Sequence, residues 1–165
     1  MKVILLGPMG AGKSTLGKIL SRDLGWPYFD NDDEITSNYG LTAAEVALLP
    51  VPELHELESR YLFDVLQREE SFVAGAAASV IESEENRILI SAAVGVYLRL
   101  PLEEIIERAG TSGVGRQALK SGGNQLLIDR FNRRDPLYRS IAKLTVELSN
   151  SPKNDAQTIK DVLLA

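Results

Sequence analysis

The stretch "GPMGAGKST", Gly7 to Thr15, decides the fold. It matches the pattern G-x-x-x-x-G-K-[ST], which ends here at Gly12, Lys13 and Ser14. A short apolar run, "KVILL", precedes it, and a segment with helical spacing of apolar residues follows it. A strand, a glycine-rich turn and a helix in this order form the setting in which such a loop binds phosphate. The sequence therefore predicts a nucleotide-binding loop.

The residue types in this loop suit a triphosphate. Glycines allow successive backbone N–H groups to curl around phosphate oxygens, and the N-terminus of the following helix adds partial positive charge. Lys13 is placed to reach the β- and γ-phosphates, and the Ser14 hydroxyl to ligate Mg²⁺. The alternative is an ordinary strand-to-helix turn that carries an exposed lysine. We expect ATP or GTP to bind at Gly10, Ala11, Gly12, Lys13, Ser14 and Thr15.

The overall composition excludes several classes of protein. Of 165 residues, 18 are Lys or Arg and 23 are Asp or Glu, so the formal net charge is −5, and no basic run occurs. Nucleic acid and anionic membranes are therefore not expected as partners. There are no cysteines, which excludes disulfides and thiolate metal sites. The start, "MKVILLGPMG", is too short an apolar run for a signal peptide or a membrane span, and we expect a cytoplasmic monomer.

Strand-like and helix-like segments alternate along the chain. Buried strands are predicted for residues 2–6, 26–30, 71–75, 93–100 and 144–149. Apolar residues have helical spacing over 14–24, 42–49, 52–68, 84–90, 102–109, 125–134, 137–142 and 156–164. Residues 111–123 contain four glycines and few apolar residues, which is typical of a mobile loop. This alternation predicts one α/β domain over residues 1–165 with a parallel sheet.

Acidic residues follow the second predicted strand. In "FDNDDEI", Asp30 and Asp32 lie at the carboxyl end of the strand, where ligand-binding residues of open α/β sheets are found. Asp30 is placed to hold Mg²⁺ through water, and Asp32 to accept a hydroxyl proton or to bind the acceptor. The alternative is that Asp32 or Asp33 caps the helix that begins at "DEIT". One of them can cap while the other binds a ligand.

With these motifs, the chain resembles the shikimate kinases over nearly its whole length. The resemblance rests on "GPMGAGKSTLGKIL", "FDNDDEI", "AVGVYLRLPLEEIIERAG" and "RRDPLYRSIAKLTVEL". It implies the three-layer P-loop kinase fold of nucleoside monophosphate kinases: a five-stranded parallel sheet flanked by helices, an acceptor-binding region near residues 31–60 and a mobile lid near 111–124. The implied reaction is Mg²⁺-dependent transfer of a phosphoryl group from ATP to a hydroxyl of shikimate, which gives shikimate 3-phosphate.

The resemblance also implies roles for single residues. Asp30 matches the family's Mg²⁺-linked aspartate, and Asp32 matches its acceptor-binding aspartate. Lys13 and Asp32 are both expected to be catalytic residues. Arg116, in "GRQAL", matches the catalytic lid arginine that stabilises charge on the transferring phosphoryl group. Arg134, in "RRDPLY", matches the arginine that binds the shikimate carboxylate. For both arginines the alternative is a solvated surface charge.

A second set of matches concerns the adenine end of ATP. Arg108 resembles the family's adenine-stacking arginine. Pro152, in the "SPK" of Ser151–Lys153, resembles the loop on the other face of the base. The alternative for Arg108 is a helix-end charge that favours the helix dipole.

Two departures from the family pattern fall in the acceptor site. His55, in "ELHELE", stands where the family has a second carboxylate-binding arginine, and a neutral histidine lacks the guanidinium's planar fork. The alternative is that His55 is an exposed residue that binds no ligand. In "VAGAAASV", Ala76, Ala77 and Ala78 replace three glycines of the family's turn. Their methyl groups make the site less polar, and alanine at any position of positive φ would be strained.

Three alternatives to shikimate phosphorylation stay open. The first is that the acceptor is a different small hydroxylated metabolite, because the acceptor residues differ from the family pattern while the ATP residues do not. The second is that the chain is a nucleotide-binding relative without catalysis, although Lys13, Ser14 and Asp30 argue against this. The third is that it is a nucleoside monophosphate kinase, although His55 removes charge from the region where an acceptor nucleotide's phosphate would bind.

Overall fold

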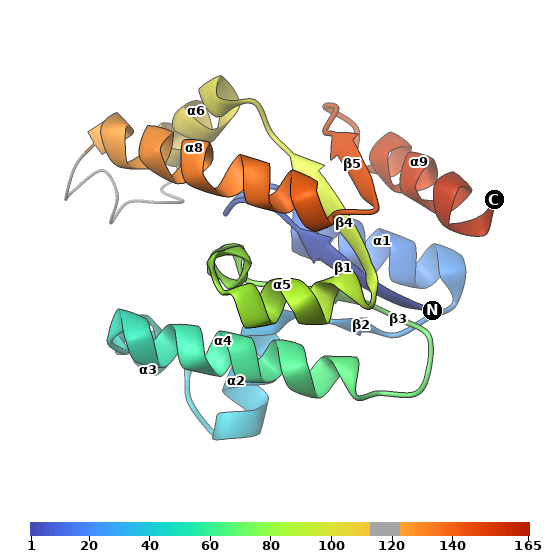
Figure 1. Ribbon diagram of the computed structural model, residues 1–165, viewed down its shortest axis with the longest axis horizontal. Helices are drawn as coiled ribbons and strands as arrows, with labels where there is room; N and C mark the ends of the chain where they lie inside the picture. Colours follow the sequence, from blue (N-terminus) through green and yellow to red (C-terminus); the bar gives the residue numbers. More distant parts are fainter. Residues whose placement is uncertain (113–122) are drawn as a thin grey trace.

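The computed structural model describes the backbone of residues 1–112 and 123–165. Its core is a five-stranded sheet in the order β2-β3-β1-β4-β5, and all neighbouring strands are parallel (Figure 1). This confirms the predicted α/β sheet. The strands are β1 (Lys2–Leu6), β2 (Tyr28–Phe29), β3 (Phe72–Gly75), β4 (Val94–Arg99) and β5 (Leu144–Glu147).

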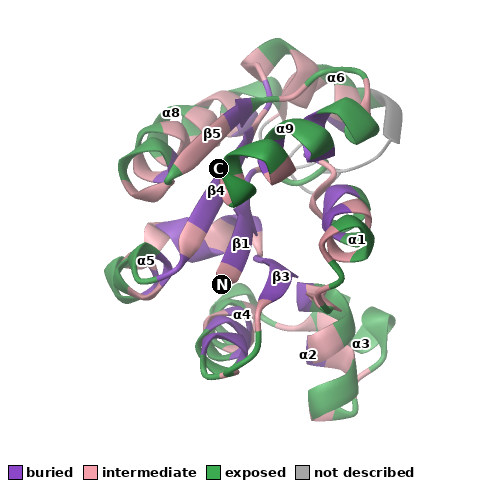
Figure 2. Cartoon of the chain, turned by 90° about the vertical axis from the view of Figure 1, so that its right-hand side faces the viewer, coloured by how far each residue is buried: buried purple, intermediate pink, exposed green. Residues whose placement is uncertain are grey.

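Helices cover both faces of the sheet, as can be followed in Figure 2, where each residue is coloured by how far it is buried. Within β1, Val3 and Leu5 pack in a hydrophobic cluster on one face of the sheet, while Ile4 and Leu6 pack in a second cluster on the other face. The alternation follows from the period of two along a strand. The helices are α1 (Lys13–Leu24), α2 (Asn31–Tyr39), α3 (Ala43–Leu48), α4 (Val51–Leu66), the 3₁₀ helix η1 (Ala78–Glu82), α5 (Glu84–Ser91), α6 (Leu102–Ser112), α8 (Gly123–Ile141) and α9 (Pro152–Leu164).

The structure corrects several predicted boundaries. A single helix, α8, replaces the two predicted around Pro136, because the side chains around the proline are anchored to the rest of the fold. Tyr138, just beyond it, stacks on Tyr97 with ring centroids 4.6 Å apart and donates a hydrogen bond to the carbonyl of Ala78 (2.7 Å). The second strand has only two residues, the helix expected at "DEIT" begins two residues earlier as α2, and η1 was not predicted.

Parallel strands place all their carboxyl ends at one edge of the sheet. The phosphate loop follows β1, Asp30 follows β2, and the turn of three alanines follows β3. The topology therefore brings together segments that lie far apart in the sequence. Of the predicted lid, Arg116 lies outside the described residues, while residues 111–112 belong to α6 and residue 123 begins α8. None of the helices in the described part of the chain is long and apolar enough to cross a membrane.

Candidate active site

A cleft of about 840 Å³ opens at the carboxyl edge of the sheet. One wall is the phosphate loop with the start of α1, and the others come from α2, α3, α4, the turn after β3, and α8. Most of the predicted site residues in the described part of the chain line it: Gly10, Gly12, Lys13, Ser14, Thr15, Asp30, Asp32, His55, Ala76, Ala77, Ala78 and Arg134. Three do not: Ala11, which is buried, and Arg108 and Pro152.

The phosphate loop has the backbone that its glycines predict. Gly12 precedes α1 in the left-handed region (φ 83°), which an L-residue rarely adopts. Gly7 also has positive φ, and a Cβ there would lie 2.6 Å from the carbonyl oxygen of Leu98. Side chains at these two positions would strain the loop. The glycines thus hold the start of α1 where its free N–H groups face the cleft.

Lys13 folds back over its own loop. Its ammonium donates hydrogen bonds to the carbonyl oxygens of Gly7 and Pro8, both at 2.9 Å. Burial lowers the pKa of Lys13 to about 8, although Asp32 and Asp30 act in the opposite direction. A phosphate oxygen entering the loop would restore full charge to this amine.

Ser14 and Asp30 meet across the cleft floor. The Ser14 hydroxyl donates to Oδ2 of Asp30 at 2.5 Å, and the phenol of Tyr28 donates to the same oxygen at 3.1 Å. Tyr28 packs where Gly17 and Gly75 leave room, since a Cβ at either residue would lie within 3 Å of its ring or hydroxyl. Sequence reasoning missed Tyr28, although its position on the strand that leads to Asp30, two residues before it, was an available signal.

Asp30 is also the N-cap of α2, so the alternative that Asp32 or Asp33 caps this helix is wrong. Its Oδ1 accepts a hydrogen bond from the backbone N–H of Asp32 at 3.0 Å. The residue before a helix has extended backbone and can turn its side chain back to the first turn, which Asp32 and Asp33, inside the helix, cannot do. Burial alone would raise the pKa of Asp30, but hydrogen bonds from Ser14, Tyr28 and the backbone hold it below its usual value.

The Ser14 and Asp30 pair fits Mg²⁺. A hydroxyl and a carboxylate are the oxygen ligands that this ion prefers. Among the described residues no group of three or more His, Cys, Asp or Glu side chains forms a metal site.

Asp32 lies in the cleft beside the buried Asn31. The amide Nδ2 of Asn31 donates to Oδ1 of Asp32 at 3.0 Å, while Oδ1 of Asn31 is buried without a hydrogen-bond partner. A buried, unsatisfied oxygen in a cleft marks a place where a ligand or water donates a hydrogen bond. Asp32 is thus held at the mouth of a polar pocket by its neighbour.

A buried carboxyl group, missed by the sequence analysis, lies on the opposite wall. Glu58 of α4 is 8% exposed and accepts a 2.5 Å hydrogen bond from the Ser79 hydroxyl. Burial raises the pKa of Glu58, partly offset by Ser79 and by His55, one turn away. Glu58 interrupts the helical series Leu54, Leu57, Tyr61 and Leu62, and a carboxylate within such an apolar face was the signal available.

The three alanines form the end wall of the cleft. Ala76 is 2% exposed and belongs to the core, Ala78 is buried, and Ala77 is half-buried. Ala77 has φ −62°, and no non-glycine residue of the described part has positive φ. The alanines are therefore accommodated without the backbone strain considered above, and their effect is to fill space with methyl groups.

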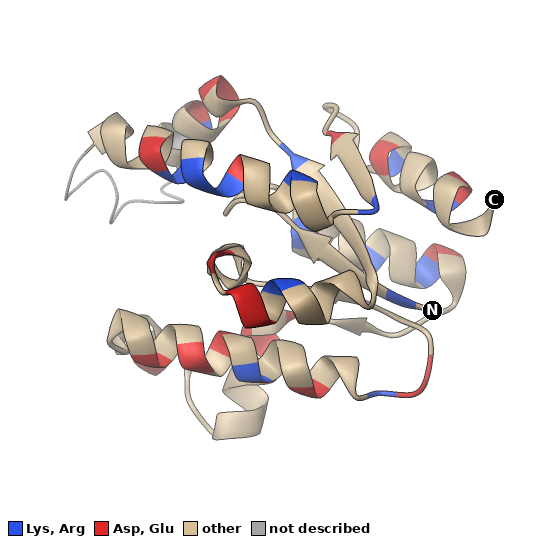
Figure 3. Cartoon of the chain, in the orientation of Figure 1, with Lys and Arg blue, Asp and Glu red and all other residues tan. Residues whose placement is uncertain are grey.

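Arginines of α8 form the remaining wall. Arg134, with its side chain 15% exposed, pairs with Glu82 (Nη2 to Oε2, 3.2 Å), and Glu82 also binds Arg133. The Nε of Arg134 is buried and has no hydrogen-bond partner. Arg130, one turn earlier, lines the same cleft and was not predicted. Figure 3 shows how often basic residues recur along this helix.

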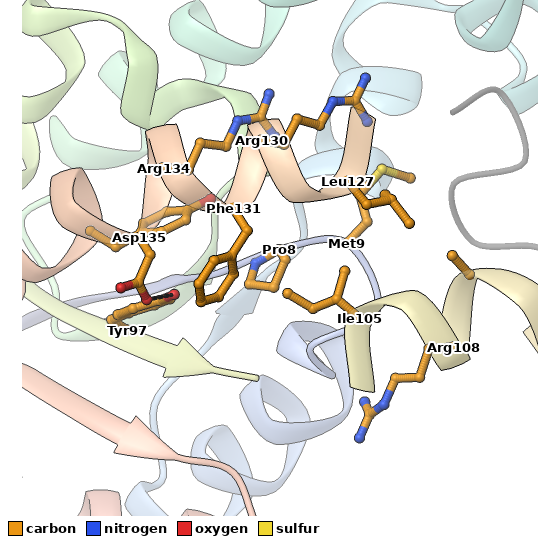
Figure 4. A pocket seen from close by; sticks show the side chains of 12 residues that line it. Pro8, Met9, Tyr97, Ile105, Arg108, Leu127, Arg130, Phe131, Arg134 and Asp135 are labelled. Carbon is orange, nitrogen blue, oxygen red and sulfur yellow. Dashed lines mark hydrogen bonds between the residues drawn. The ribbon is translucent and has the colours of Figure 1, made fainter. Parts of the chain in front are cut away.

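Arg108 contacts the phosphate loop from outside the cleft. Its guanidinium donates to the carbonyl oxygen of Gly10 at 2.7 Å and pairs with Glu104 at 3.3 Å. It borders a separate apolar cavity of about 60 Å³ between α6, α8 and the loop, together with Met9, Phe131 and others (Figure 4). Pro152 is the first residue of α9. The adenine-binding roles of Arg108 and Pro152 stay predictions.

Comparisons with known proteins agree with this geometry. A family model described as shikimate kinase matches residues 9–164. A shikimate kinase of Rhodococcus jostii is 32% identical over 148 residues, 88% of this chain and 86% of that protein. Another, of Chromohalobacter salexigens, is 33% identical over 146 residues, 87% of this chain and 81% of that protein.

Solved structures give the same result. A shikimate kinase from Acinetobacter baumannii in complex with shikimate has a TM-score of 0.87 at 29% identity, over 99% of this chain and 92% of that one. Fold, phosphate loop and family model thus point the same way, and the resemblance seen in the sequence is confirmed. The chain belongs to the shikimate kinase family.

Proposed function

We propose that this protein transfers the γ-phosphoryl group of ATP, with Mg²⁺, to a hydroxyl of shikimate. The observation that carries the proposal is a single cleft with two chemically different halves. Lys13, Ser14 and Asp30 form a phosphate and metal half, and Asp32 and Arg134 face it from the acceptor half. A kinase needs both halves in one cavity, because its catalysis is mainly positioning and charge stabilisation.

In this mechanism each residue has a separate task. Lys13 leaves the carbonyl oxygens of Gly7 and Pro8 to bind β- and γ-phosphate oxygens. Ser14 and Asp30 would hold Mg²⁺, Asp30 through water, and the ion would supply positive charge beside the phosphates. Asp32 accepts a hydrogen bond from the attacking hydroxyl and takes its proton as the new P–O bond forms and the bond to ADP breaks. By resemblance to the family, Arg116 stabilises the charge on the transferring phosphoryl group.

Arg134 orients the acceptor. Its buried, unpartnered Nε and its position in the cleft suit a carboxylate, which a guanidinium binds through two parallel hydrogen bonds. Such a grip fixes the ring so that one hydroxyl faces the γ-phosphate. We place the protein in the cytoplasm as a single-domain monomer.

A second candidate is favoured by the apolar side of the acceptor half. This part of the cleft is lined by Val46, Val51, Leu54 and Ala77. The resemblance to the family places an arginine where this chain has His55. A less polar small alcohol would suit such walls better than a trihydroxy acid. Weaker binding of shikimate, with another hydroxylated metabolite as the acceptor, follows from this arrangement.

The experiment is a comparison of ADP formation with shikimate and with a panel of polyols, sugars and hydroxy acids. The proposal expects shikimate to raise ADP formation well above the rate without acceptor. Stimulation by another alcohol alone would transfer the assignment to that alcohol. A protein that binds ATP tightly but gives no transfer to any acceptor, with the same behaviour in Lys13→Ala, would be a nucleotide-binding relative without catalysis.

A further inference from the structure

Helix α8 presents two guanidinium groups to the active-site cleft. Arg130 and Arg134 lie four residues apart, so they share one face of the helix, and both line the cleft. Figure 4 shows their side chains extending from α8 in the same direction, away from Phe131 and Tyr97. Like charges at this spacing destabilise a helix slightly, so an anion bound between them would relieve a repulsion present in the free protein.

The guanidinium groups of Arg134 and Arg130 differ in their hydrogen-bond and ion-pair partners. Arg134 shares its charge with Glu82, which also holds Arg133. Arg130 is half-buried and forms no hydrogen bond or ion pair with any residue in the described part of the chain. It borders both the small apolar cavity, with Leu127, and the main cleft. Such a residue can pack its aliphatic stem on apolar groups while its charged end faces a solvent-filled site.

The charge balance of the acceptor half indicates why a second cation is needed. Asp32 and Glu58 both bring carboxyl groups to this half, and the charge of Arg134 is partly balanced by Glu82. An acceptor that carries a carboxylate would meet net repulsion there if Arg134 acted alone. Histidine at position 55 lacks the planar fork with which a guanidinium binds a carboxylate.

We propose that Arg130 is a specificity-determining residue that binds the acceptor's carboxylate together with Arg134. The inference rests on the proposed function and adds to it a second guanidinium on α8, which selects acceptors that carry an acid group. Burial, with Arg134 and Arg133 next in effect, lowers the pKa of Arg130, as expected for a cation that lacks a partner until its ligand binds.

The test compares Arg130→Gln, Arg130→Lys and the parent protein in steady-state kinetics. Two acceptors are used: shikimate and its uncharged methyl ester. Arg130→Gln should raise KM for shikimate about 10- to 100-fold, the usual value of a hydrogen-bonded charge, with little change in kcat or in KM for ATP. The rise in KM when the ester replaces shikimate, called here the ester penalty, should be large in the parent and much smaller in Arg130→Gln. Arg130→Lys, which keeps the charge without the fork, should fall between them.

Arg139→Gln is the matched control on the same helix. Arg139 is 48% exposed, pairs with Asp135 and does not line the cleft, so this variant should keep the parent's ester penalty. An unchanged ester penalty in Arg130→Gln, or a rise in KM for ATP instead of shikimate, overturns the inference. If the parent itself does not phosphorylate shikimate, the proposed function fails first, and this inference fails with it.

Discussion

The hydroxyl of Ser14 lies 2.5 Å from Oδ2 of Asp30, although the two residues belong to different elements. Ser14 lies in the first turn of α1, and Asp30 directly follows the short strand β2. These two oxygens hydrogen-bond to each other. An Mg²⁺ ion held at this point would replace that hydrogen bond.

The first prediction concerns this pair. Asp30→Asn should raise the Mg²⁺ concentration for half-maximal turnover about 10- to 100-fold, because a water-mediated carboxylate orients the metal's first shell. Asparagine still caps α2, but the variant loses the carboxylate that accepts from Ser14 and Tyr28, so the free energy of unfolding at neutral pH should fall modestly. Asp33→Asn, an exposed change in the same turn, is the control. Equal Mg²⁺ dependence in Asp30→Asn and Asp33→Asn would remove Asp30 from the metal site.

The second prediction concerns the pH dependence of ATP binding. The pKa of Lys13 is lowered to about 8, so its ammonium loses the proton, and the charge that binds phosphate, as pH rises through that value. Affinity for ATP should therefore fall by up to about tenfold per pH unit above about pH 8. Isothermal titration calorimetry from about pH 7 to about pH 9 measures this. Lys13→Met should bind more weakly without the inflection, and a parent affinity constant over this range would contradict the assignment.

The third prediction concerns the buried carboxyl group of Glu58. Its folded-state pKa is raised, so between the ordinary value and the raised value the folded state binds more protons than the unfolded state. Stability therefore decreases as pH rises through that window. Glu58→Gln should raise the free energy of unfolding at neutral pH, and the gain should vanish below about pH 4.5. Urea unfolding at both pH values checks it, with the exposed Glu56→Gln as control. A gain of the same size at both pH values would contradict it.

The fourth prediction concerns the alanine wall. Ala77 is the most exposed of the three, so Ala77→Gly should lower KM for shikimate by removing a methyl group from the cleft. It should also reduce the free energy of unfolding by about 0.5–1 kcal/mol, through added chain entropy. Ala76→Gly, at a buried core position, should cost similar stability without the kinetic gain.

The combined variant extends this prediction to the whole acceptor wall. His55→Arg with glycine at Ala76, Ala77 and Ala78 should bind shikimate more tightly than either change alone. A folded quadruple variant that binds no better than the parent would contradict our account of the acceptor half.

Much of the phosphate half could be predicted because it is local in sequence. The pattern from Gly7 to Thr15 fixes loop, helix start and lysine together, and Asp30 follows a strand by one residue. The alternative that Asp32 or Asp33 caps α2 was wrong because it placed the start of the helix one or two residues late. Helix starts are among the least certain features of a sequence, since several neighbouring acidic residues can cap.

The acceptor half was less predictable because its contacts join distant segments. Glu58 and Ser79 are 21 residues apart, and Arg134 and Glu82 are 52 residues apart. No local pattern indicates that Arg130 would share the cleft, since an arginine on a helix usually points to solvent. Pro136 gave a misleading signal for the same reason, because the contacts that keep α8 continuous, such as that of Tyr138 with Ala78, are tertiary.

The central claim is most directly tested by following the fate of phosphate from ATP in the presence of shikimate, Mg²⁺ and purified protein. Phosphorus NMR and mass spectrometry of the mixture should show shikimate 3-phosphate and ADP appearing in equal amounts. Lys13→Ala should reduce the formation of both by orders of magnitude. ADP released only at the rate seen without shikimate, with no phosphorylated shikimate in the products, would contradict the account.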